Sequence, residues 1–102
     1  MFMIPNWREH QGYQRRGPSW VKLHVRLLSN KAWPRLSILA RATLPALWIV
    51  ASEQSQDGSF DDDTESLAHL LSMSHFELSS AIVELKSFGF IDSDKSVAIL
   101  RA

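Results

Sequence analysis

The chain of 102 residues contains no cysteine. A disulfide framework and a thiolate metal site are therefore impossible, and because nothing indicates an oxidising compartment, we expect a cytoplasmic protein. Long apolar runs are also missing. The longest, from Leu44 to Ala51, contains Pro45 and is far too short to span a bilayer, and the first residues lack the apolar core of a signal peptide. We expect no membrane partner.

Glycine is scarce, with four scattered residues, and no phosphate loop or nucleophile-elbow pattern is present. Among the four histidines, His69 and His75 fall on different predicted helices, without the same-face spacing of a helical zinc site. An aspartate run at 61–63 could bind a divalent cation, but helix capping explains it without an ion. We therefore expect no enzyme, no cofactor and no metal site.

The formal net charge of the whole chain is zero, yet the charges are unevenly distributed. Residues 1–52 contain eight Lys and Arg residues against Glu9 alone, whereas residues 53–102 contain ten acids against three bases, so the halves carry +7 and −7. A basic surface of this kind can meet phosphate or an acidic partner. The asymmetry also permits head-to-tail self-association.

A helix-turn-helix pattern occupies the stretch from Asp61 to Ile91. Its first helix has capping candidates at Asp62 and Asp63, with Glu65 completing a capping box, and its second begins at a Ser74–Glu77 box. Apolar residues then recur at helical spacing up to Phe88, and Gly89 stands where a left-handed residue closes a helix. Two helix starts this close together predict a sharp turn.

Short strands are predicted around this motif. Phe90-Ile91 and residues 97–100 flank a polar loop at 92–96, which would be the wing, and Ser59-Phe60 after the turn at Asp57-Gly58 is the expected third strand. The predicted fold is mainly α with a small antiparallel β-wing, a winged helix-turn-helix, in a domain over residues 19–102.

Residues 1–18 show no sustained period and are interpreted as an N-terminal basic and aromatic arm. Trp7 and Tyr13 lie among Arg8, Arg15 and Arg16, a mixture that could place charge on phosphates and rings on bases. The alternative, which we favour slightly, is that the two rings fasten the arm to the domain.

The next segment, 20–28, alternates Val21, Leu23, Val25 and Leu27 with Lys22, His24 and Arg26, which favours a half-buried strand at its start, although a helix also fits. The basic stripe on its exposed face is either functional or a solvated edge. The longest helix is expected from Ile38 to about Glu53 after the N-cap Ser37. Pro45 predicts a kink or a split near Thr43.

The second helix of the motif has few of the side chains that recognise base edges. With Leu78, Ala81, Ile82, Leu85 and Phe88 inward, the outward residues are Phe76, Ser79, Ser80, Val83 and Ser87, flanked by His75, Lys86, Glu77 and Glu84. Serines could contact phosphate, and Phe76 and Val83 could touch thymine methyl groups. The same uncharged face suits a protein partner equally well, or Phe76 could pack into the core.

Several segments resemble a known family. NWREHQ at 6–11, WVKLH at 20–24, LPALW at 44–48, ASE at 51–53 and the later ELKSFGFI at 84–91 are similar to the N-terminal winged-helix module of phage and prophage replication-initiation proteins, which are replisome-organiser-like. The similarity covers most of the chain. It implies binding to origin DNA or assembly of initiation and helicase-loading complexes.

Two functional hypotheses follow. The first is a phage or prophage nucleic-acid-binding module linked to replication initiation, which binds duplex DNA through Arg8, Arg15, Arg16, Lys22 and Arg26, with Ser79, Ser80, Lys86 and Lys95 as secondary contacts. The second is an interaction module, an adaptor or inhibitor, that binds a host or phage replication or defence protein, or a second copy as a homodimer. It would use Phe76, Val83, Glu77 and Glu84.

Overall fold

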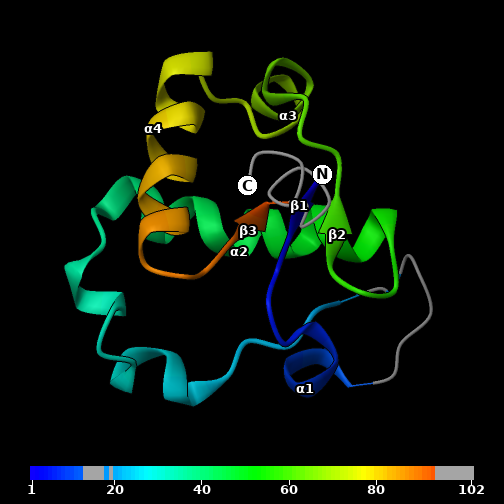
Figure 1. Cartoon of the computed structure of the whole chain (residues 1–102), viewed down its shortest axis with the longest axis vertical. Helices are drawn as coiled ribbons and strands as arrows, with labels where there is room; N and C mark the ends of the chain where they lie inside the picture. Colours follow the sequence, from blue (N-terminus) through cyan, green and yellow to red (C-terminus); the bar gives the residue numbers. More distant parts are fainter. Residues whose placement is uncertain (13–17, 19, 94–102) are drawn as a thin grey trace, which may run out of the picture.

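The computed structural model describes residues 1–12, 18 and 20–93. In order, its elements are β1 (Phe2–Met3), α1 (Trp7–Gln11), the 3₁₀ helices η1 (Val25–Ser29) and η2 (Trp33–Arg35), α2 (Ile38–Gln54), β2 (Ser59–Phe60), α3 (Thr64–Leu70), α4 (His75–Ser87) and β3 (Asp92–Ser93). Helices dominate, and the three short strands form one antiparallel sheet (Figure 1). The predicted class, mainly α with a small sheet, is confirmed.

The N-terminal strand β1 lies at the centre of this sheet. The strand order is β2-β1-β3, with Phe2 paired to Phe60 on one side and to Ser93 on the other. The predicted strand at Ser59-Phe60 is confirmed. The predicted strand at Phe90-Ile91 is wrong by two residues, because β3 starts at Asp92 inside the expected loop. The other predicted wing strand, 97–100, and Lys95 lie outside the described residues.

The two helices of the pair form where the capping pattern predicts them. The expected Asp62–Glu65 capping box is wrong, because Asp62 binds the Met1 ammonium and Asp63 is the N-cap. Asp63 caps α3 by accepting hydrogen bonds from the backbone N–H groups of Glu65 and Ser66, and Ser74 with Glu77 forms a complete capping box at α4. Between the helices Ser72 adopts a left-handed conformation with φ of 56°. Because these bonds satisfy backbone donors at both helix starts, the turn is fixed by local sequence.

Helix α2 runs without interruption through Pro45, so the split expected near Thr43 is wrong. Its start is capped by Ser37, whose side chain accepts from the Ala40 N–H at 3.1 Å. Leu44 and Leu47 are fully buried in the core. Packing of residues on both sides of the proline holds the helix together despite the one backbone bond that proline cannot make.

The first eleven residues of the predicted arm form β1 and α1 and place three apolar side chains in the core. Phe2, Ile4 and Trp7 are all buried, and the Phe2 ring lies 5.6 Å from that of Phe60 between centroids. Trp7 therefore fastens this segment to the domain. This confirms, for Trp7, the interpretation that the sequence analysis favoured. Tyr13 lies outside the described residues.

The segment after the undescribed residues is not the strand that its alternation favoured. Residues 20–24 have no regular structure and η1 follows, while Leu23, Val25 and Leu28 are all more than half exposed. The sheet core is already filled by β1, so the apolar side of this segment has no sheet to pack against. Alternation alone therefore gave the wrong element here.

Candidate nucleic-acid interface

Helix α1 holds the following segment through one glutamine. Gln11 is buried, and its amide both donates to the Lys22 carbonyl at 2.9 Å and accepts from the Lys22 N–H at 2.7 Å. The His24 ring nitrogen also donates to the backbone oxygen of His10. The two histidine rings lie edge to face, with 5.4 Å between their centroids. These bonds fix Lys22, His24 and Arg26 beside α1, the helix that carries Arg8.

Five exposed cations lie on α1, on η1 with the residues that flank it, and on η2; we call them the basic layer. They are Arg8, Lys22, Arg26, Lys31 and Arg35. Within the described ranges none of them pairs with a carboxylate, and the single ion pair found there joins the Met1 ammonium to Asp62. Glu9 is the only acid on α1. This layer therefore presents positive charge that the protein itself does not neutralise.

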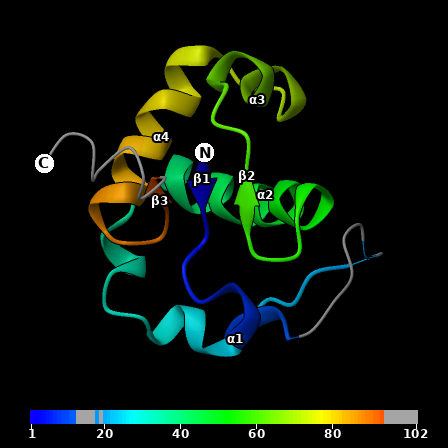
Figure 2. The ribbon, with the colours of Figure 1, turned by 45° about the vertical axis from the view of Figure 1, so that its right-hand side comes forward.

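Acidic residues gather at the other end of the molecule. Figures 1 and 2 show α1 and η1 at one end of the long axis and α3 at the other. Asp61, Asp62, Asp63 and Glu65 are exposed at the start of α3. Hydrogen bonds from the Ser66 hydroxyl and N–H lower the pKa of the Asp63 carboxyl, and the Met1 ammonium lowers the pKa of Asp62. These groups stay ionised at neutral pH, so this end repels phosphate.

Helix α4 presents an uncharged and partly apolar face. Phe76 is 81% exposed and Val83 is 65% exposed, so Phe76 does not pack into the core. Ser80 is exposed, while Ser79 is half-buried and supplies less surface. Of the predicted phosphate contacts on this helix, only Ser80 and Lys86 are fully exposed.

The charged residues of α4 already have partners inside the protein. The Lys86 ammonium lies 4.7 Å from the centre of the Phe2 ring. Glu77 accepts from the Ser74 N–H at 3.0 Å, and Glu84 accepts from the N–H and the hydroxyl of Ser37. These bonds lower the pKa of both carboxyls. Lys86, Glu77 and Glu84 therefore all contribute to the fold, whatever else they bind.

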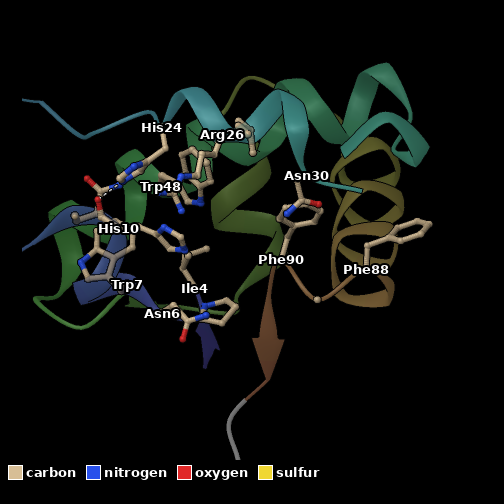
Figure 3. Close-up of a pocket in the computed structure, with 14 residues that line it drawn as sticks. Ile4, Asn6, Trp7, His10, His24, Arg26, Asn30, Trp48, Phe88 and Phe90 are labelled. Carbon is tan, nitrogen blue, oxygen red and sulfur yellow. Dashed lines mark hydrogen bonds between the residues drawn. The ribbon is translucent and has the colours of Figure 1, made fainter. Parts of the chain in front are cut away.

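A hollow of about 250 Å³ opens between α1, η1 and the end of α4 (Figure 3). Its lining includes the aromatic residues Trp7, Trp48 and Phe90. Polar groups lie among them: His24, Arg26 and Asn30 come from η1 and its flanks, and His10 and Asn6 come from α1 and its lead-in. No carboxylate is among the described residues that line it. The hollow therefore combines flat apolar surface with positive charge.

Of the predicted leading set of nucleic-acid contacts, Arg8, Lys22 and Arg26 are all exposed, on α1, before η1 and on η1. Arg15 and Arg16 of that set lie outside the described residues. No site role was predicted for Trp48 or Asn30, which line the hollow. No local pattern signals either residue, because their neighbours in the hollow come from distant parts of the chain.

Other site classes find little support in the part of the chain that the structure describes. No group of three or more His, Asp or Glu side chains there could hold a metal ion. His75 is hydrogen-bonded to the Thr64 hydroxyl at 2.8 Å. No described helix has the length and apolar character needed to cross a membrane.

Comparison of the chain with protein-family models, with curated proteins and with solved structures gives no match.

Proposed function

We propose that the chain is a winged-helix nucleic-acid-binding module that grips phosphates through the basic layer. The observation that carries this proposal is a set of exposed cations on α1, on η1 and beside η1, which have no carboxylate partner among the described residues and lie at the end of the molecule opposite the acids of α3. Phosphate contacts supply most of the affinity of a protein that binds nucleic acid without reading its sequence. An electrically polarised molecule would also orient its basic end toward the strand as it approaches.

The order of elements supports the winged-helix part of the proposal. Helix α2, strand β2, the α3–α4 pair and strand β3 follow one another as the helix-turn-helix and sheet of such a fold do. Among the described strands, β1 lies between β2 and β3, and β3 consists of the first residues of the expected wing. The resemblance to phage replication-initiation modules supports a role in the initiation of DNA replication in a phage or prophage.

The distribution of charge favours the basic layer over α4 as the contact. A helix that enters the major groove needs donors for base edges and must lie close to phosphates. Helix α4 presents Phe76, Ser80 and Val83, and its one lysine is drawn toward Phe2. Its first turn lies beside the acidic end. We therefore propose binding that depends on salt and little on base sequence.

The salt dependence of binding tests this proposal. Fluorescence anisotropy with a labelled random duplex and with a single strand would give Kd at several salt concentrations. Three to five phosphate contacts from the basic layer predict a slope of log K against log salt of about −2 to −3.5 for single strands and about −3 to −4.5 for duplex. Contacts by Arg15 and Arg16 would steepen it. Affinity that does not change with salt, or no binding at low salt, would refute the proposal.

A specific observation favours a second function, binding of a protein partner through α4. Phe76 and Val83 are large, apolar and mostly exposed, and Ile38, 79% exposed, follows the Ser37 that bonds to Glu84 on α4. Exposed apolar residues grouped on one face are a feature of protein interfaces. The partner would be a host or phage replication or defence protein, or a second copy.

This second function is tested by affinity capture from host lysate with and without nuclease. A partner that survives nuclease treatment, is lost in Phe76→Glu and is kept in Ile49→Glu would support it. The control Ile49 is also exposed but lies on α2. If the captured partner is lost only when nuclease is added, it binds through nucleic acid and not through α4.

A further inference from the structure

The hollow between α1, η1 and the end of α4 has features that phosphate binding by the basic layer does not require. Trp48 and Phe90 are half-buried, so part of each ring is exposed in the hollow (Figure 3). Flat rings with an open face bind other flat rings by stacking. Cations that contact phosphates at an exposed surface do not need aromatic rings beside them.

The polar groups around the hollow have unused hydrogen-bonding capacity. Asn30 accepts a bond from the Ala32 N–H at 2.8 Å through its side-chain oxygen, which leaves its NH₂ group as a donor. Arg26 is exposed, and no hydrogen bond to its guanidinium is found within residues 1–12 and 20–93. Donors without acceptors beside aromatic rings favour a ligand that carries acceptors and negative charge.

Size and shape narrow the class of ligand. At about 250 Å³ the hollow lies just below the usual range of about 300–1,000 Å³ for ligand sites, so it holds a single small unit and no folded partner. In a duplex the bases are stacked and paired, so a base reaches such a recess only from a single strand or after flipping out. A nucleotide combines a flat ring, acceptors on its edge and an anionic phosphate.

We propose that this hollow binds one nucleotide of a single strand. Its base stacks against Trp48 and Phe90, the Asn30 NH₂ group donates to an acceptor on the base edge, and Arg26 binds the phosphate. This inference rests on the proposed function and sharpens it, because it gives the protein a preference for unpaired over paired DNA. The basic layer then carries the neighbouring phosphates of the same strand.

Matched variants separate the hollow from the general charge of the basic layer. Arg26 lines the hollow, whereas Lys31 is also exposed and belongs to the same basic layer but does not line the hollow. With an oligothymidine of about twelve nucleotides as the probe, Arg26→Gln should raise Kd about tenfold, since it removes a charge-assisted hydrogen bond. Lys31→Gln removes the same charge and should raise Kd less than about threefold. Thermal melting of each variant checks the fold, and Asn30→Leu is a second, uncharged test.

Tryptophan fluorescence gives an independent readout. Stacking of thymine on Trp48 should quench the emission, and Trp48→Phe should remove most of this quench while affinity changes little, because the phenyl ring still stacks. Trp20→Phe is the control: Trp20 is 62% exposed and does not line the hollow, so its loss should leave the quench intact.

The outcomes separate this inference from the proposed function. Strand binding without a Trp48-dependent quench, and with equal effects of Arg26→Gln and Lys31→Gln, would overturn the nucleotide site and leave phosphate binding standing. A quench by thymidine monophosphate alone, sensitive to Arg26→Gln but without binding of any strand, would overturn the single-strand assignment and the proposed function together, and would identify a free nucleotide as the ligand. No quench and no binding with either probe would also overturn both.

Discussion

The carboxylate of Glu84 on α4 accepts hydrogen bonds from both the backbone N–H of Ser37, at 2.8 Å, and its hydroxyl, at 2.6 Å. The same hydroxyl accepts from the Ala40 N–H and so caps α2. One serine therefore joins the start of the longest helix to Glu84 in the last turn of α4, 47 residues further along the chain. This contact sets how the helix-turn-helix pair sits on the rest of the fold.

Loss of this serine should destabilise the protein through the cap as well as the helix contact. We expect Ser37→Ala to lower the free energy of unfolding by about 1 kcal/mol, because the Ala40 N–H loses its acceptor. Ser37→Thr, which keeps a capping hydroxyl, should lose less. Urea unfolding followed by circular dichroism measures both, and equal stability of Ser37→Ala and the unchanged protein would contradict this role.

Stability should fall as the solution becomes acidic. Bonds from Ser37 and Ser74 hold the pKa of the Glu84 and Glu77 carboxyls below their usual value of 4.5. A carboxyl whose pKa is lower in the folded chain binds fewer protons there than in the unfolded chain. Its contribution is therefore full above the unfolded pKa and is lost as pH falls through the folded pKa, so the loss begins near the usual value of 4.5 and continues below it.

The Glu84→Gln variant isolates one of these carboxyls. Its Tm at neutral pH should be lower than that of the unchanged protein, and the two values should converge as pH falls below about 4.5, since only the unchanged protein has this charge to lose. Glu53→Gln is a suitable control, because Glu53 is exposed and its carboxylate accepts no hydrogen bond within the described part of the chain. A gap in Tm that is constant with pH would contradict the account of Glu84.

Gly58 should tolerate no side chain. Its φ is +87°, and a Cβ there would lie 2.7 Å from the Trp7 Cβ and 3.0 Å from the Ile4 carbonyl oxygen. Ile4 also donates its N–H to the Gly58 carbonyl at 3.0 Å, so the two segments cannot easily separate. Gly58→Ala should cost roughly 3 kcal/mol, from left-handed strain together with overpacking.

Gly89 provides the matched comparison for this substitution. Its φ is +80°, but a Cβ there would meet nothing within 4 Å. Gly89→Ala should therefore show the conformational strain alone, about 1 kcal/mol. Denaturant unfolding of the two variants gives the difference directly, and equal losses would mean that the close approach of Trp7 to Gly58 is absent.

The N-terminal strand should be essential to the sheet. Phe2 is buried between the other two strands, packs on Phe60 and lies under the Lys86 ammonium. Phe2→Ala should cost about 3 kcal/mol or more, the usual range for a buried phenylalanine. If chemical unfolding showed a loss below about 1 kcal/mol, β1 would not be the central strand.

The helix-turn-helix could be predicted from the sequence because its signals are local. The Ser74–Glu77 box spans three residues, and Gly89 closes α4 with a left-handed conformation wherever the rest of the chain lies. The central strand could not be predicted, since Phe2 acquires its partners Phe60 and Ser93 only when the chain folds back on itself. Two residues also show too little pattern to signal a strand.

The candidate site also combines features that the local sequence signals with features that depend on long-range contacts. The basic character of Arg8, Lys22 and Arg26 follows from composition alone, and their common location follows from the two hydrogen bonds of the Gln11 amide, which no pattern announces. The alternation around Lys22 predicted a strand because a sequence pattern does not show which segments will pack against it in the folded chain. The hollow depends on Trp48, which sequence reasoning could recognise only as a core residue.

Equal charge reversals on the two competing surfaces test the central proposal most directly. Arg8→Glu and Lys86→Glu each change the net charge by the same amount, one on the basic layer and one on α4. In anisotropy titrations with the same labelled strand at one salt concentration, we predict that Arg8→Glu raises Kd by about tenfold or more and Lys86→Glu by less than about threefold. Equal effects, or a larger effect of Lys86→Glu, would contradict binding through the basic layer.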